Sequence, residues 1–220
     1  MEKAKRVQAV SIIGGADGPT SVFLVGRKSG AKPSLKQRVE QYLYKRKRAR
    51  VKRSITASSH TLEETCQYMI KRYAAREVPK KNRKYQQEYH SLRESMILRE
   101  KPELLGEAGK LQKPKAMDEA SLREFWAQTE KRSELIKALP DDMFPMDIWL
   151  YQIHLRERGE LFVTIEKTRG ILACSYSGSK KAMKALKLIV RDISLYYGVT
   201  EKDIREKTER YQSLVTTLSS

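Results

Sequence analysis

The spacing of apolar residues changes near residue 146, and this change constrains the fold more than any other feature. Before it, apolar side chains recur every three or four residues, which is the helical period. These helical segments begin near residues 34, 61, 82 and 118. After it, apolar and polar residues alternate in three runs, at residues 146–155, 160–167 and 171–176. Because short connectors join the runs, the pattern predicts a three-strand antiparallel meander.

A helical period returns after the meander, over residues 179–197 and 201–218. Near the N-terminus, the β-branched runs 7–13 and 21–25 flank a segment with three glycines and a proline, which predicts a β-hairpin. An isolated hairpin is only marginally stable, so we expect it to join the meander. The expected fold class is α+β, with a small antiparallel or mixed sheet and about six helices beside it.

The chain divides by composition into three segments. Residues 1–32 hold the hairpin, its glycine-rich loop and a linker, and residues 33–117 hold a basic helix and a helical region. Residues 118–220 hold a helix, the meander and two C-terminal helices. A chain of 220 residues can bury a core without metal or disulfide, so we expect one compact domain overall.

Positive charge is concentrated in the first quarter of the chain. The formal net charge is +18, and residues 1–59 contain 15 basic and 3 acidic side chains. Between Arg27 and Arg53 there are twelve positive charges and a single negative one, Glu40. Such a block repels itself and favours an anionic partner, commonly a phosphate backbone or an anionic membrane surface.

The first part of this basic region is expected to be a helix capped by Ser34. An apolar stripe at helical spacing predicts its packed face: Leu35, Val39, Tyr42 and Leu43. The stripe ends where the densest charge begins. We therefore expect residues 45–53 to have little contact with the core.

Two observations predict a cytoplasmic protein that does not insert into a membrane. Cys66 and Cys174 lie far apart in dissimilar contexts, which indicates a reducing compartment rather than a disulfide framework. The longest weakly charged segment, residues 7–26, carries Asp17 at its centre. A buried aspartate there would cost about 3 kcal/mol on insertion.

The segment Ser11–Leu24 contains the octapeptide GGADGPTS. It resembles a signature of the β subunit of sodium-translocating decarboxylases. Those pumps couple decarboxylation of oxaloacetate, glutaconyl-CoA or methylmalonyl-CoA to sodium export. The resemblance implies a role in sodium binding for the aspartate matched by Asp17. It covers about 14 of the 220 residues, and the whole chain is similar to small soluble proteins that share only this motif.

Two interpretations of the glycine-rich loop remain open. Its residues are Gly14, Gly15, Asp17, Gly18, Pro19 and Thr20. Successive backbone N–H groups around glycines can bind an anion. Alternatively, the loop is a tight turn in which Asp17 hydrogen-bonds its own backbone. The spacing fits neither a Walker loop nor a dinucleotide fingerprint.

A second candidate anion site follows the last expected strand. It consists of Ser177, Gly178, Ser179, Lys180 and Lys181. Backbone N–H groups at a helix start, hydroxyls and lysines together suit a phosphate or a carboxylate. The alternative is that Ser177 or Ser179 only caps the helix.

No pattern in the sequence indicates a catalytic residue, a metal ligand or a cofactor. His60, His90 and His154 are scattered and fit no zinc-binding spacing. Neither cysteine lies in a recognisable nucleophile setting, and no Ser-His-Asp arrangement is evident. An enzyme is therefore the less favoured class.

The basic block is the leading candidate site. Its residues are Tyr42, Tyr44, Lys45, Arg46, Lys47, Arg48, Arg50, Lys52 and Arg53. Lysine and arginine neutralise phosphates irrespective of sequence, and tyrosines stack on unpaired bases. The main hypothesis is a soluble basic protein that binds nucleic acid or a ribonucleoprotein through Arg27–Arg53, without catalysis. Two alternatives for the basic block are a solubilising arm and a basic helix that pairs with acidic residues elsewhere in the chain. Two further alternatives are a protein-interaction module using the GGADGPTS hairpin and a small-anion binder or enzyme using Ser177–Lys181.

Overall fold

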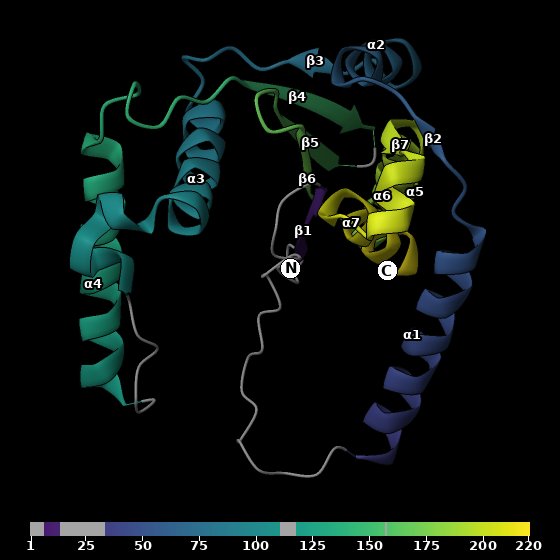
Figure 1. The fold of residues 1–220 in the computed structure, drawn as a ribbon, viewed down its shortest axis with the longest axis horizontal. Helices are drawn as coiled ribbons and strands as arrows, with labels where there is room; N and C mark the ends of the chain where they lie inside the picture. The colour runs from purple at the N-terminus through teal and green to yellow at the C-terminus, as the bar shows by residue number, and fades with distance from the viewer. Residues whose placement is uncertain (1–6, 14–33, 111–117, 157) are drawn as a thin grey trace. The chain divides into compact units, whose positions relative to one another are not determined.

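A computed structural model of the chain describes residues 7–13, 34–110, 118–156 and 158–220 (Figure 1). Contacts within the chain group it into two compact units. Unit 1 combines Met1–Glu77 with Trp149–Ser220, and unit 2 is the intervening segment Val78–Ile148. This grouping by contacts differs from the division by composition, because both ends of the chain contribute to unit 1.

A five-stranded sheet with the order β1-β6-β5-β4-β3 forms the centre of unit 1. Its strands are β1 (Val7–Ile13), β3 (Arg76–Glu77), β4 (Ile148–Leu155), β5 (Gly159–Glu166) and β6 (Ile171–Gly178). The expected meander is confirmed as β4, β5 and β6. β1 pairs antiparallel with β6, from Val7 opposite Gly178 to Ile13 opposite Leu172. The N-terminal strand therefore joins the meander, while the run 21–25 lies outside the described residues.

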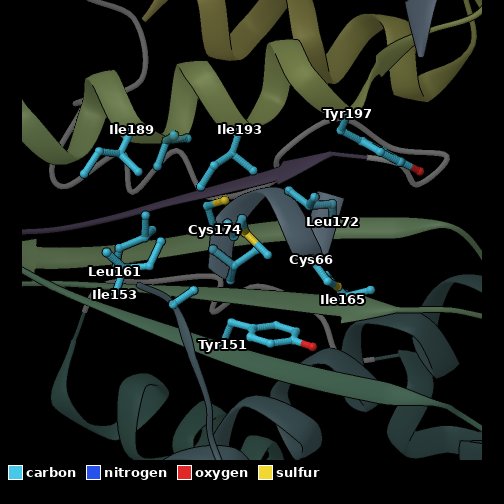
Figure 2. Packing of buried hydrophobic residues seen from close by; sticks show 14 of the residues in the cluster. Cys66, Tyr151, Ile153, Leu161, Ile165, Leu172, Cys174, Ile189, Ile193 and Tyr197 are labelled. Atoms are coloured by element: carbon cyan, nitrogen blue, oxygen red, sulfur yellow. The ribbon is translucent and has the colours of Figure 1, made fainter. Parts of the chain in front are cut away.

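One face of this sheet forms the main core of unit 1. Residues two apart along the strands contribute to it: Tyr151, Ile153, Leu161, Val163, Ile165, Leu172, Cys174 and Tyr176. The helices α2 (Leu62–Tyr73) and α5 (Lys180–Tyr197) supply the other half of the core. Figure 2 shows Ile189 and Ile193 of α5 pointing towards the strands that carry Leu161 and Cys174. The period-two pattern of the strands is confirmed, because it puts alternate apolar side chains on the covered face.

A second apolar cluster lies beside the first. It is formed by Val199, Tyr211, Leu214, Val215 and Leu218. Its elements are β7 (Gly198–Val199), which pairs with β2 (Ser58–Ser59), and the C-terminal helix α7 (Glu209–Ser219). Three further side chains pack against it: Val51 and Ile55 at the end of α1 (Leu35–Ser54), and Ile204 of α6 (Glu201–Glu206).

The described residues form eight helices rather than about six, so the expected count is wrong. The helix expected over 201–218 is split into α6 and α7. It breaks at Lys207, which adopts a left-handed conformation with φ 52°. There the backbone N–H groups of Lys207 and Thr208 both donate to the Asp203 carbonyl oxygen, and the Thr208 hydroxyl donates to the Asp203 side chain at 2.6 Å. The second addition, the 3₁₀ helix η1 (Pro102–Lys110), lies within the expected connector.

Unit 2 contains α3 (Arg83–Glu100), η1 and α4 (Glu119–Ala138). Its most unusual core residue is Arg93, whose side chain is buried. Arg93 pairs with Asp141 at 2.9 Å and donates to the carbonyl oxygens of Leu139 and Pro140 at 2.8 Å. The guanidinium therefore satisfies carbonyl groups that follow α4.

No helix in the described part of the chain combines the length and the apolar content needed to cross a membrane.

Gly198 and Arg210 join the two clusters of unit 1. Gly198 caps α5 with φ 59° and ψ −158°, a conformation that only glycine adopts readily. A Cβ atom there would lie 1.7 Å from the Ser58 carbonyl oxygen. The Arg210 guanidinium donates to the carbonyl oxygen of Gly198 at 2.8 Å and lies 3.7 Å from the Tyr197 ring centroid. These contacts let the chain turn at the end of α5, so that β7 pairs with β2 and α7 packs beside it.

Replacing Gly198 with alanine should lower the free energy of unfolding by at least about 2 kcal/mol, because it adds backbone strain and a steric clash. Gly170→Ala is the matched control: its φ is also positive, at 66°, but the nearest atom would be 3.6 Å from the new Cβ. We expect the control to cost about 1 kcal/mol. Urea denaturation of both variants measures the difference, and equal losses would contradict the close approach of Ser58.

Candidate nucleic-acid interface

The basic block lies on α1, a helix that begins with a complete capping box. The Ser34 hydroxyl accepts from the Gln37 backbone N–H at 3.3 Å, and the Gln37 side-chain oxygen accepts from the Ser34 N–H at 3.1 Å. The expected cap at Ser34 is confirmed. The 20 residues of α1 span about 30 Å and carry nine basic side chains and one acidic side chain.

The C-terminal half of α1 is docked on α7, contrary to expectation. Val51 and Ile55 lie four residues apart and pack against the cluster of α7 and β7. The Lys47 ammonium donates to a backbone oxygen of Ser220 at 2.7 Å, and an Arg48 N–H donates to the Gln212 side chain at 3.3 Å. Two apolar positions within the charged block therefore anchor the helix.

The expected apolar stripe at the start of α1 is exposed instead. Leu35 is 79% exposed, Val39 and Leu43 are each 54% exposed, and Tyr42 is 64% exposed. Helical spacing alone predicted a packed face, but nothing in the described part of the chain covers it. Tyr44, at 41%, is exposed as well. Both tyrosines of the candidate site are therefore accessible to a ligand.

Most cations of the block face solvent. Lys45, Arg46, Arg50, Lys52 and Arg53 are all exposed. Across residues 34–110, 118–156 and 158–220, no aspartate or glutamate forms an ion pair with any of the block's seven cations, and Lys47 instead contacts an oxygen of Ser220 at 2.7 Å. Of these five side chains, Arg53 donates from Nε to the carbonyl oxygen of Ala49 at 3.3 Å, one turn back in the same helix. Their charge is available for an external anion.

The spacing along α1 brings four of the accessible groups to one side. Tyr42, Arg46, Arg50 and Arg53 follow one another at intervals of four, four and three residues, which is one face of a helix. Val51 and Ile55 lie on a different face, because they are turned towards α7. The arrangement can neutralise several phosphates in a row while a tyrosine stacks on a base.

Part of the predicted polyanion region and the whole glycine-rich loop lie outside the described residues. This applies to residues 27–33 and to Gly14, Gly15, Asp17, Gly18, Pro19 and Thr20. The anion-nest and tight-turn interpretations of that loop both stay predictions.

The second candidate anion site lies where β6 meets α5. Ser177 and Gly178 are the last residues of β6 and pair with β1 and β5. The Ser179 hydroxyl caps α5 by accepting from the Ala182 backbone N–H at 3.2 Å. Lys180 and Lys181 are exposed. Capping uses the hydroxyl that an anion would need, and binding of an anion here stays a prediction.

Sequence reasoning missed an aromatic stack in unit 1. Tyr196 of α5 stacks on His60 with ring centroids 3.8 Å apart and on Tyr68 of α2 with centroids 3.9 Å apart. The three rings come from distant segments, so no local spacing could reveal them. Among the described residues, no group of three or more His, Cys, Asp or Glu side chains is arranged to hold a metal ion.

Comparisons with models of known families, with curated proteins and with solved structures found no match for this chain.

Val51→Ala should lower the free energy of unfolding by about 1 kcal/mol, because it removes two partly buried methyl groups from the anchor on α7. The matched control is Val39→Ala, the same substitution at an exposed position of the same helix, which should change stability by less than about 0.5 kcal/mol. Urea denaturation measures both. An equal or larger loss at Val39 would show that the other half of α1 is the packed one.

Both thiols should be unreactive in the folded protein. Burial raises the pKa of Cys66 to about 11 and that of Cys174 to about 12. Since only the thiolate reacts, labelling by a disulfide reagent near pH 8 should be more than about a hundredfold slower in the native state than in urea. Rapid labelling of the native protein would contradict this burial.

The same shifts predict how stability depends on pH. The pKa of the Cys66 thiol is higher in the folded protein than the value of 9.0 in the unfolded chain. The unfolded state therefore ionises first as the pH rises. The contribution of this thiol to stability is fully present below about pH 9 and is lost as the pH rises towards 11. The free energy of unfolding should therefore decrease over that interval.

Proposed function

We propose that this protein binds nucleic acid, as a free strand or as the exposed RNA of a ribonucleoprotein, along the solvent-facing side of α1. The protein neutralises phosphates and does not read base sequence or catalyse a reaction. The observation that carries this proposal is the set of exposed cations Lys45, Arg46, Arg50, Lys52 and Arg53, for which no described carboxylate is a partner.

Two features support a ligand rather than a solubilising arm. The cations lie on a helix that is anchored through Val51 and Ile55, so their positions are fixed in unit 1. The exposed Tyr42 lies one turn before Arg46 on the same side of α1 as Arg46 and Arg50. Fixed cations beside an aromatic ring are the combination that binds single strands, where phosphates and unstacked bases are both accessible.

The test compares two variants that each lose three positive charges. The first combines Arg46→Gln, Arg50→Gln and Arg53→Gln on the free side of α1. The control combines Lys184→Gln, Lys187→Gln and Lys202→Gln, which are exposed positions of unit 1 outside the block. Fluorescence anisotropy with a labelled single-stranded RNA is measured over a series of salt concentrations, and circular dichroism verifies that both variants fold.

The first variant should bind at least about tenfold more weakly at low salt, and its slope of log affinity against log salt should be shallower by about 2. The control should retain most of the affinity and most of the slope, because its charges lie outside the interface. The proposal is wrong if the parent protein does not bind at low salt, if its affinity is independent of salt, or if both variants lose affinity equally.

A further inference from the structure

Unit 1 contains a cavity of about 760 Å³ that is open to solvent, more a surface cleft than an enclosed void, and its described lining belongs to α2, β4 and the end of α5. This volume lies within the range of small-molecule sites, roughly 300 to 1,000 Å³. No residue of α1 contributes to the described lining, so the cavity is a different feature from the basic interface.

Rigid aromatic rings form walls of the cavity. Tyr68 and Tyr196 are stacked with 6° between their planes, and His60 supports the far side of Tyr196. Trp149 of β4 is half-buried against the main core, and the Lys167 ammonium lies 4.0 Å from its ring centroid. Because packing holds these rings in place, a planar ligand can bind without the cost of ordering them.

The polar groups of α2 in this cavity are separated by charge. Glu63, Glu64 and Gln67 lie in its first half, whereas Lys71 and Arg72 lie in its last turn. Eight residues separate Glu63 from Lys71, which corresponds to about 12 Å along the helix. A ligand therefore meets hydrogen-bond acceptors at one end and cations at the other.

The two carboxylates already have partners within unit 1. Glu63 lies 3.2 Å from the Lys167 ammonium. Glu64 accepts from the Thr61 backbone N–H at 2.8 Å as part of the capping box of α2. Their repulsion of an anionic ligand is therefore reduced, while their remaining lone pairs can still accept from an amine.

The cations at the other end are more available. Lys71 is exposed and forms no ion pair with any residue that the structure describes. Arg72 pairs with Asp192 at 3.3 Å, but its side chain is 57% exposed. Its guanidinium lies 5.8 Å from the Tyr68 ring centroid, so a charged group and an aromatic wall adjoin each other.

We propose that this cavity binds a nucleotide whose base carries an exocyclic amine, either free or as one residue of a strand. The base lies against Tyr68 and Trp149 with its amine towards Gln67 and the carboxylates, and the phosphate lies at Lys71 and Arg72. This choice of ligand class rests on the nucleic-acid function proposed above, although the residues involved are separate from α1.

The test uses Trp149 as the reporter. The chain has two tryptophans, and Trp126 is 66% exposed in unit 2, so we expect Trp126→Phe to fold and its tryptophan fluorescence to come from Trp149 alone. Adenosine 5′-monophosphate should quench this fluorescence saturably. Adenosine should bind at least about tenfold more weakly, because it lacks the phosphate. Ribose 5-phosphate, which has no ring to stack, should leave the fluorescence unchanged.

Lys71→Glu should weaken binding of adenosine 5′-monophosphate at least about tenfold and leave adenosine binding unchanged. The matched control is Lys184→Glu, an exposed lysine of α5 outside the cavity, which should bind like the parent. Thermal unfolding gives a second measurement: at one concentration of the mononucleotide, the Tm of the unmodified chain and of the control should rise more than that of the Lys71 variant. Absence of saturable quenching, or equal affinity in the Lys71 variant, overturns the proposal.

Two further titrations distinguish the sources of the nucleotide and the two proposals. A short oligoadenylate that quenches Trp149 at lower concentration than the mononucleotide identifies a strand as the source, whereas quenching by the mononucleotide alone identifies a free nucleotide. The variant with Arg46→Gln, Arg50→Gln and Arg53→Gln should bind the mononucleotide like the parent. If RNA binds through α1 but the mononucleotide does not bind, the cavity proposal fails and the proposed function stands.

Discussion

Burial of one face of β4, β5 and β6 determines how unit 1 is assembled. Alternate residues of these strands form an apolar surface, and α2 and α5 cover it. Because α5 is fixed on the sheet, Gly198 at its end, which accepts a hydrogen bond from Arg210 of α7, fixes where the chain turns towards α7. The helix α7 then supplies the apolar surface on which α1 docks. The position of the basic helix therefore depends on packing by residues more than 140 positions away along the chain.

The parts of the fold that local patterns encode could be predicted from the sequence. Alternation gave the three-strand meander, and the capping residue Ser34 marked the start of α1. The break at Lys207 was missed because a helical period does not reveal a left-handed residue, which is held here by backbone and side-chain bonds to Asp203. The buried Arg93 was missed for a similar reason, since its partners follow α4.

The candidate interface was only partly predictable. The density of charge on α1 is evident in the sequence, but which cations remain accessible depends on tertiary packing. Lys47 and Arg48 bind residues 173 and 164 positions away, so no local pattern separates them from Arg46 and Arg50. The cavity was not predictable at all, because its aromatic walls come from α2, β4 and α5.

The crowding of like charges on α1 opposes the helix that presents them. Residues three or four apart are neighbours on a helix, and five such pairs in this block are both cationic: Lys45–Arg48, Lys47–Arg50, Arg50–Arg53, Arg46–Arg50 and Arg48–Lys52. At about 0.2 to 0.5 kcal/mol each, their mutual repulsion weakens the helix by about 1 to 2.5 kcal/mol. A polyanion laid along the helix would relieve this strain, so occupancy and helicity are thermodynamically linked. Binding of the proposed polyanion would therefore stiffen residues 45–53 relative to the free protein.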